Sequence, residues 1–228
     1  MTRDVELVVC PDVEAAARAA AERLAGAARA GAAIALSGGS TPKRAYQIAA
    51  MLEPSWAKAQ IWWGDERCVP PHDAHSNYRL AREALLDRLS RSPEVHRIRG
   101  ELPPEEAAAA YEEELGDLRL GLALMGLGPD GHTASLFPGA PTLDELERRV
   151  VPAEPRLEPF VERVTLTLPA LRASHEVLFL ATGAEKADAA RRAFAEEPSK
   201  ETPASLLRAD DGRTVAILDE AAARDLSI

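Results

Sequence analysis

A histidine and an aspartate stand two residues apart near the middle of the chain, directly after a glycine-rich stretch. His132 follows Asp130, and Gly126 and Gly128 come shortly before them. A carboxylate beside an imidazole orients the ring and stabilises its protonated form, which is what a general base requires. A single histidine is more often structural. Here its place after a glycine-rich strand exit favours proton transfer as the chemistry of this segment.

A second segment, Ser37-Gly38-Gly39-Ser40-Thr41-Pro42, joins an apolar run to a helical pattern. Gly38 and Gly39 let the backbone approach a ligand closely, and the first turn of a helix presents unpaired N–H groups to an anion. Ser40 and Thr41 add hydroxyl groups, so a phosphate suits the segment. An ordinary tight turn with a helix cap explains it equally well. The segment lacks the Gly-Lys-Ser/Thr of a Walker loop and the three spaced glycines of the dinucleotide fingerprint.

A third segment carries acids at the end of an apolar run. Asp65 follows the run Gln60–Gly64, where a carboxylate can point into a crevice. An apolar strand seldom ends in an acid without a functional reason, so Asp65 is a candidate catalytic residue. A surface ion pair between Glu66 and Arg67 is the simpler explanation of that pair, and Ser76 is explained by a helix cap.

Two other kinds of site are weakly supported. His72, Asp73 and His75 lie close together, but no further well-placed ligand joins them, and a solvated loop explains them better than a metal does. The chain has no Gly-x-Ser-x-Gly elbow for a serine nucleophile. Neither a metal nor a cofactor is therefore predicted.

Short apolar runs alternate with longer amphipathic ones around these segments. Strands are predicted at Val5–Cys10, Ala32–Leu36, Gln60–Gly64, Leu120–Met125, Arg163–Leu168, Glu176–Ala181 and Thr214–Leu218. Helices are predicted from Asp12 to about Ala30 before Gly31, from Pro42, from Asn77 to about Leu89, after Pro104 to near Gly116, over Ala184–Ala195 and after Leu218, with Pro152–Pro159 as a surface loop. The fold class is therefore α/β: a three-layer sandwich with a mostly parallel, Rossmann-like sheet, in one domain of residues 1–228. Ligands of such sheets bind outside the carboxyl ends of the strands, where the three segments lie.

The composition of the chain limits the classes of ligand and partner that it can bind. The formal net charge is −10 and 46% of the 228 residues are apolar. The acidic balance argues against nucleic acid as a partner, and an anionic substrate would need cations gathered at one place. No apolar run is long enough for a membrane span, and no secretory signal precedes the first strand. Cys10 and Cys68 are expected to be reduced, and the expected location is cytoplasmic.

In this order and spacing, the segments resemble those of the 6-phosphogluconolactonase family over nearly the whole chain. The shared motifs are the segment 37–42, Asp65-Glu66-Arg67-x-Val69-Pro70 with Ser76-Asn77, Gly126-x-Gly128-x-Asp130-Gly131-His132-Thr133-Ala134-Ser135-Leu136-Phe137-Pro138, Arg163 to Pro169, and Thr182-Gly183-x-x-Lys186. The resemblance implies a fold shared with glucosamine-6-phosphate deaminases. It also implies hydrolysis of 6-phospho-D-glucono-1,5-lactone without metal or cofactor, the second step of the oxidative pentose phosphate pathway.

The resemblance also implies roles for single residues. His132 would be the base, oriented by Asp130, with Asp65 as a further catalytic candidate. The substrate, a small sugar-phosphate lactone, would be bound by Gly38, Gly39, Ser40, Thr41, Arg67, Asn77, Arg163 and Lys186. No obligate protein partner is expected.

Two alternative functions remain. Glucosamine-6-phosphate deaminases or isomerases carry the Asp-Gly-His element too, but follow it with a glutamate-bearing segment where this chain has Ser135-Leu136-Phe137-Pro138. A non-catalytic sugar-phosphate sensor is the other alternative. Sensors of this fold usually carry a DNA-binding domain, and the chain shows no basic helix-turn-helix segment.

Overall fold

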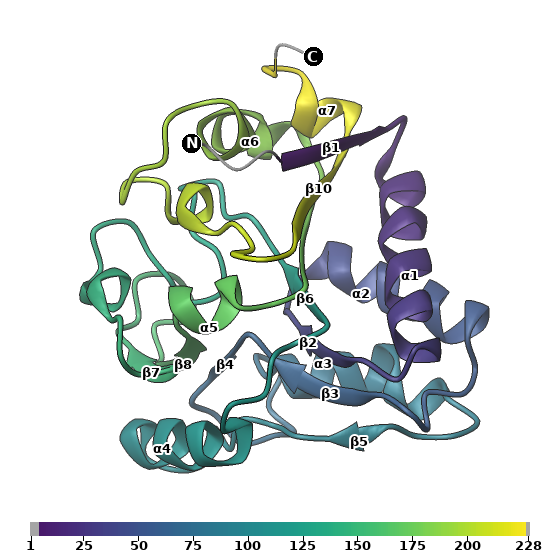
Figure 1. Ribbon diagram of the computed structural model, residues 1–228, viewed down its shortest axis with the longest axis vertical. Helices are drawn as coiled ribbons and strands as arrows, with labels where there is room; N and C mark the ends of the chain where they lie inside the picture. Colours follow the sequence, from purple (N-terminus) through teal and green to yellow (C-terminus); the bar gives the residue numbers. More distant parts are fainter. Residues whose placement is uncertain (1–4, 227–228) are drawn as a thin grey trace.

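The apolar runs of the sequence form a seven-stranded sheet in which each strand pair is parallel (Figure 1). The computed structural model describes residues 5–226. In spatial order the strands are β1 (Val5–Cys10), β10 (Arg213–Asp219), β9 (Glu176–Ala181), β6 (Leu122–Met125), β2 (Ala33–Leu36), β3 (Gln60–Trp63) and β5 (Glu94–Val95). β6 and β9 are buried along their whole length, as expected of strands that are covered on both faces.

The chain reverses its direction across the sheet between β2 and β6. It runs outward from β2 through β3 to β5 and then returns to place β6 on the other side of β2. Ile34 pairs with Leu122 and Ala35 with Ala123 at this junction. The loops that leave β2 and β6 therefore diverge from neighbouring strands, which makes the carboxyl ends of these strands the switch point where a ligand binds in such sheets.

Helices cover the sheet. They are α1 (Val13–Arg29), α2 (Ser40–Leu52), α3 (Asn77–Ala84), α4 (Pro104–Leu115), α5 (Leu168–Arg172), α6 (Ala187–Phe194) and α7 (Glu220–Ala223), with 3₁₀ turns η1 (Leu86–Arg88), η2 (Pro141–Asp144), η3 (Ala184–Lys186) and η4 (Pro203–Leu206). α1 and α2 pack against each other on one side of the sheet (Figure 1). The buried face of α1 consists almost entirely of alanine, which lets the two helices approach closely.

A second, three-stranded sheet lies on the opposite side (Figure 1). It consists of β4 (Asp65–Arg67), β8 (Arg163–Leu166) and β7 (Val150–Ala153), and its pairs are antiparallel. The three-layer α/β prediction is confirmed, but the strand expected at Arg163–Leu168 belongs to this small sheet and not to the parallel one. Its alternation of polar and apolar residues predicts a strand without showing which partner it pairs with.

Several predicted boundaries shift for local reasons. α2 begins at Ser40, two residues before Pro42, because proline is tolerated throughout the first helical turn. β8 ends at Leu166 because Pro169 lies in the first turn of α5. The stretch Pro152–Pro159 is not all loop, since β7 includes Pro152 at the edge of the small sheet.

The helix predicted after Ser76 is shorter than expected: α3 ends at Ala84, and η1 follows it in place of the last turn. The predicted helix over Ala184–Ala195 is likewise divided into η3 and α6. Within residues 5–226, no helix is both long enough and apolar enough to cross a membrane.

Candidate active site

A cavity of about 210 Å³ opens at the carboxyl ends of β2, β3 and β6. All three predicted segments contribute to it, and so do β8 and the segment after β9. Eight of the predicted site residues line the cavity: Gly38, Gly39, Asp65, Arg67, Asn77, His132, Arg163 and Lys186. The switch point of the sheet therefore brings together residues from widely separated parts of the sequence.

The loop of residues 126–133 carries the His–Asp pair. His132 Nδ1 lies 2.5 Å from Asp130 Oδ1, and the His132 backbone N–H donates to the same oxygen at 3.2 Å. The Gly128 N–H donates to the His132 carbonyl at 2.8 Å and Thr133 Oγ1 donates to the Gly126 carbonyl at 2.8 Å, so the loop closes on itself. The residues after His132 form a tight turn with Ala134 at φ 49°.

The proton distribution in this pair follows from Asp130. Burial alone would raise the pKa of Asp130, but the hydrogen bond and the charge of His132 outweigh it and leave the pKa below its ordinary value. An ionised carboxylate can only accept, so Nδ1 of His132 carries the hydrogen. The lone pair of the neutral ring then lies on Nε2, which is the nitrogen able to take a proton. Phe137 supports the ring from another side, with centroids 5.0 Å apart.

The Ser37–Thr41 turn brings backbone to the cavity. Gly39 has φ +112°, and a Cβ on Gly38 would lie 2.0 Å from Asn77 Oδ1, so both positions require glycine. No side chain caps α2, in contrast to α1 and α3, which are capped by Asp12 and Ser76.

The side chains of Ser40 and Thr41 lie outside the cavity. Ser40 and Thr41 are not among the lining residues, and Thr41 Oγ1 lies 2.9 Å from Thr182 Oγ1. The turn therefore presents its glycine backbone to the cavity, and not the hydroxyl groups that the sequence emphasised.

Asp65 is buried, with both carboxylate oxygens in use. Ser135 Oγ donates to Oδ2 at 2.7 Å and Asn77 Nδ2 donates to Oδ1 at 3.2 Å. Asn77 Nδ2 also donates to the Asp65 carbonyl at 2.9 Å. A carboxylate oxygen can accept further bonds, so Asp65 can still accept a hydroxyl from a ligand in the cavity.

Glu66 has a different role from a surface ion pair. It is only 3% exposed and accepts from the backbone N–H groups of Arg67, Asn77 and Tyr78 and from Ser76 Oγ. Ser76 also accepts from the Arg79 N–H, so the helix cap predicted for it is confirmed. Together these bonds fix the start of α3, and with it Asn77, beside β4.

Three cations face the cavity. Arg67 and Arg163 are register partners on β4 and β8, and Lys186 ends η3. Burial lowers the pKa values of Arg163 and Lys186; nearby acids oppose this, Asp65 for Arg163 and Glu185 with Asp130 for Lys186. In a chain of net charge −10, this is the local gathering of positive charge that an anionic ligand needs.

The cavity also holds polar atoms that lack partners. Within the described chain, Ser37 Oγ, Asn77 Oδ1, Arg67 Nε and Arg163 Nε are buried without a hydrogen bond. Buried polar groups are normally paired, so such a cluster indicates a polar ligand or ordered water at this place. Three of the four residues were predicted for the site, and Ser37 was not.

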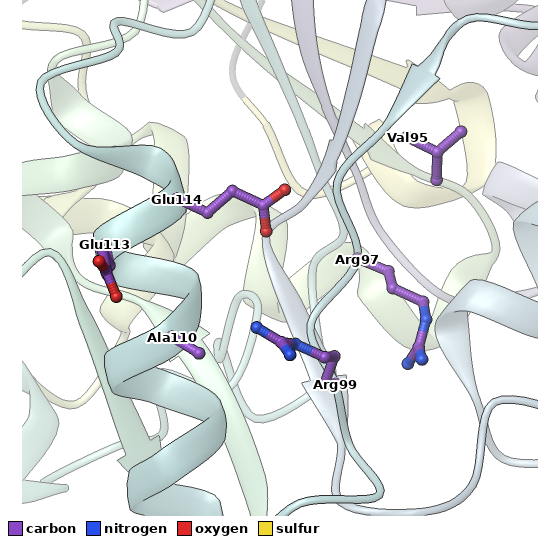
Figure 2. A pocket seen from close by; sticks show the side chains of 6 residues that line it. All are labelled: Val95, Arg97, Arg99, Ala110, Glu113 and Glu114. Carbon is purple, nitrogen blue, oxygen red and sulfur yellow. The ribbon is translucent and has the colours of Figure 1, made fainter.

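A larger concavity, of about 540 Å³, lies between α4 and the segment that follows β5 (Figure 2). Two of its four charged side chains bond residues outside its lining: Arg97 forms two bonds to Glu101, and Glu114 bonds His96. It is lined by two arginines, two glutamates, a valine and an alanine, with no histidine, cysteine, serine or threonine among them. The smaller cavity, which holds the His–Asp pair, is therefore the candidate active site.

Sequence reasoning overlooked two side chains that shape the site. Ser135 bonds Asp65, and Phe137 packs between His132 and Arg163, whose guanidinium carbon lies 5.6 Å from the ring centroid. Both follow His132 within five residues, so their proximity to the pair was the available signal. What the sequence could not show is the tight turn that folds them back toward it.

Comparison with known proteins agrees with this geometry. The profile of the family described as glucosamine-6-phosphate isomerases/6-phosphogluconolactonase matches residues 11–216. The 6-phosphogluconolactonase of Homo sapiens is 42% identical over 93% of this chain and 87% of its own length, and that of Streptomyces coelicolor is 37% identical over 99% and 96%. The solved structure of 6-phosphogluconolactonase from Trypanosoma cruzi superposes with a TM-score of 0.87 at 30% identity, covering 100% of this chain and 99% of the other. The chain therefore belongs to the glucosamine-6-phosphate isomerase/6-phosphogluconolactonase family.

Proposed function

We propose that this protein hydrolyses 6-phospho-D-glucono-1,5-lactone to 6-phosphogluconate, the second step of the oxidative pentose phosphate pathway. The observation that carries the proposal is the combination, in one cavity, of an Asp130-oriented His132 and the cations Arg67, Arg163 and Lys186. His132 can activate water, and the three cations can bind a phosphate. The lactonases among the relatives support the choice of substrate.

The reaction requires no covalent intermediate with the protein. Nε2 of His132 takes a proton from water, and the resulting hydroxide adds to the lactone carbonyl carbon C1. When the tetrahedral intermediate collapses, the bond from C1 to the ring oxygen breaks, and the imidazolium gives its proton to that oxygen. Asp130 stabilises the imidazolium between the two transfers. The backbone of Gly38 and Gly39, at the uncapped start of α2, supports an oxyanion or a phosphate oxygen.

Binding the phosphate positions the distant carbonyl. Arg67, Arg163 and Lys186 line the cavity, and we assign the phosphate to them. Fixing the phosphate holds C1 next to the water, so part of the binding free energy serves to lower the activation free energy of the reaction. Ser40 and Thr41, also predicted for the phosphate, would need to turn toward the cavity to take part.

The segment after His132 favours a lactonase over a deaminase. Residues 135–138 are Ser-Leu-Phe-Pro and contain no acid to assist the opening of an amino-sugar ring. Ser135 is instead bonded to Asp65. We further propose that the chain works as a single domain in the cytoplasm, which its two unpaired cysteines, Cys10 and Cys68, support.

The test is turnover of freshly made lactone, followed as acid release and corrected for spontaneous hydrolysis. His132→Ala should lower kcat by about 10²–10⁴-fold with little change in KM, the usual contribution of a positioned base. His72→Ala, at an exposed loop position, is the matched control and should keep full activity. A folded His132→Ala protein with normal kcat would remove this residue from the mechanism.

The phosphate assignment has its own test. Arg163→Ala should weaken binding of the phosphorylated lactone roughly ten- to a hundredfold, the value of one charge-assisted contact. Wild type should turn over an unphosphorylated gluconolactone poorly, and Arg163→Ala should do no worse on it. Equal losses on both substrates would show that Arg163 is structural or catalytic.

A further inference from the structure

The 126–133 loop is contacted from outside the cavity by an arginine on α6. Arg192 Nη2 donates to the Pro129 carbonyl at 3.2 Å, and Nη1 donates to Thr202 Oγ1 at 2.6 Å and, more weakly, to the Asp130 carbonyl at 3.5 Å. Nε of the same guanidinium donates to Asp188 Oδ2 at 2.9 Å. One side chain therefore binds two consecutive carbonyls, three and two residues before His132, and is itself fixed by an acid on its own helix.

The contact leaves the loop no room to move outward. Gly131 has φ +91°, and a Cβ there would lie 2.9 Å from Thr202 Cγ2 and 3.2 Å from Arg192 Nη1. The Ala204 N–H also donates to the Gly131 carbonyl at 3.0 Å. Arg192 and the segment around Thr202 thus form a close-fitting outer wall for the loop, on the opposite side from the cavity.

We propose that Arg192 is a positioning residue for the base: by binding the carbonyls of Pro129 and Asp130 it sets the position from which the Asp130 carboxylate holds His132. Arg192 is not among the residues that line the cavity, so it acts through the loop and not on the substrate. The inference rests on the proposed function, in which His132 takes the proton from water.

The same stretch of chain carries a cation of the cavity. Lys186 ends η3, α6 begins at the next residue, and Arg192 lies on α6. One continuous helical segment therefore positions both a phosphate-binding cation and the loop of the base. This element then helps to set the separation between the bound phosphate and Nε2 of His132, which must place C1 within reach of the base.

The neighbouring residue supplies a matched control. Arg191 also bonds Asp188, at 2.8 Å, and forms a further ion pair with Glu196. It is on the same helix and shares the same acidic partner, but no bond joins it to the 126–133 loop among the described contacts. Replacing Arg191 or Arg192 by alanine removes the same charge from α6, and only the second change releases the loop.

The experiment compares Arg192→Ala, Arg192→Lys and Arg191→Ala by kinetics and by proton NMR. Arg192→Ala should lower kcat about 10- to 100-fold with KM within about twofold, because a displacement of about 1 Å costs this much. We expect the short 2.5 Å contact with Asp130 to give the His132 Nδ1 proton a downfield resonance in wild type, and this resonance should weaken or disappear in Arg192→Ala. Arg191→Ala should retain both kcat and the resonance.

Arg192→Lys provides a second test of the inference in case the alanine variant fails to fold. Lysine keeps the charge but cannot bind the two carbonyls with a planar fork, so its kcat should lie between those of wild type and Arg192→Ala. A lysine variant equal to wild type, or an alanine variant with the kcat and resonance of Arg191→Ala, would overturn the inference. Absence of lactone turnover in wild type would instead overturn the proposed function, and the resonance would still report on the loop.

Discussion

At the residue scale, the pair of His132 and Asp130 is confined by the backbone next to it. A Cβ on Gly128 would lie 2.0 Å from His132 Nδ1 and 2.5 Å from Asp130 Oδ1. Real Cβ atoms do not approach other atoms this closely. Glycine is therefore required at position 128 for the imidazole of His132 to contact the carboxylate of Asp130. The bond between them thus depends on a residue that contributes no functional group.

Gly128→Ala should therefore lower kcat nearly as much as His132→Ala does, by about 10²-fold or more, because the methyl group displaces the ring from its carboxylate. Steady-state kinetics and a circular dichroism spectrum check this together. Gly26→Ala is the control, since a Cβ there meets nothing within 4 Å, and it should leave kcat unchanged. Wild-type kcat in Gly128→Ala would show that the ring does not need its present position.

Lys186 should make phosphate binding sensitive to alkaline pH. Burial lowers the pKa of its ammonium group, with Glu185 and Asp130 opposing, so it loses its charge at lower pH than an exposed lysine. Affinity for 6-phosphogluconate should fall as pH rises through this lowered pKa, because deprotonation removes a positive partner of the phosphate. Titration calorimetry at a series of pH values measures this affinity. Lys186→Arg should remove the alkaline loss, and an unchanged loss in that variant would exclude Lys186 as its origin.

The contacts of the site were predictable from the sequence only where they depend on local spacing along the chain. His132 and Asp130 are two residues apart, so local spacing was enough to predict their contact, and the structure confirms it. The side chain of Thr41 was not predictable, because its direction depends on the left-handed turn at Gly39. Arg192 was overlooked because it acts on carbonyl groups 62 and 63 residues away in sequence.

At the element scale, Glu66 joins β4 to the start of α3. Its two oxygens accept four bonds, three of them from backbone N–H groups and one from Ser76. A carboxylate at this end of a helix also interacts favourably with the helix dipole. The position of Asn77, which bonds Asp65 in the cavity wall, is therefore set by a buried acid that is not in the reaction.

Glu66→Gln should destabilise the protein by roughly 2–4 kcal/mol, because the amide nitrogen would face donors that now have an acceptor. Urea unfolding measures this. Glu83→Gln changes an exposed glutamate on the same helix, paired only with Arg79 at the surface, and should cost less than about 1 kcal/mol. Equal, small effects of the two substitutions would mean that Glu66 does not stabilise this junction.

The elements themselves were predicted unevenly. β1 and β9 appear with the expected bounds, because each is a run of mainly apolar residues in a parallel sheet. β4 and β5 have three and two residues, too few to produce a period in the sequence. β8 was found as a strand but assigned to the wrong sheet, since its partners β4 and β7 are set by tertiary packing.

At the scale of the whole molecule, the arrangement of possible metal ligands bears on the mechanism. Within residues 5–226, no group of three or more His, Cys, Asp or Glu side chains is arranged to hold a metal ion. Activity should therefore persist in the presence of a strong chelator and should not increase when Mg²⁺ or Zn²⁺ is added. A complete loss on chelation, restored by metal, would contradict a mechanism based on His132 alone.

The pairing of β1 with β10 has a consequence for how the protein is made. Val5 lies opposite Thr214 and Cys10 opposite Asp219, so β1 pairs with β10, which comes after all the other described strands in the sequence. During translation β1 remains without a neighbour, and β9 presents an open edge, until residues 213–219 have emerged. The central sheet therefore stays incomplete until β10 has been synthesised, and a nascent chain stalled before that point exposes strand edges of the kind that associate with other chains.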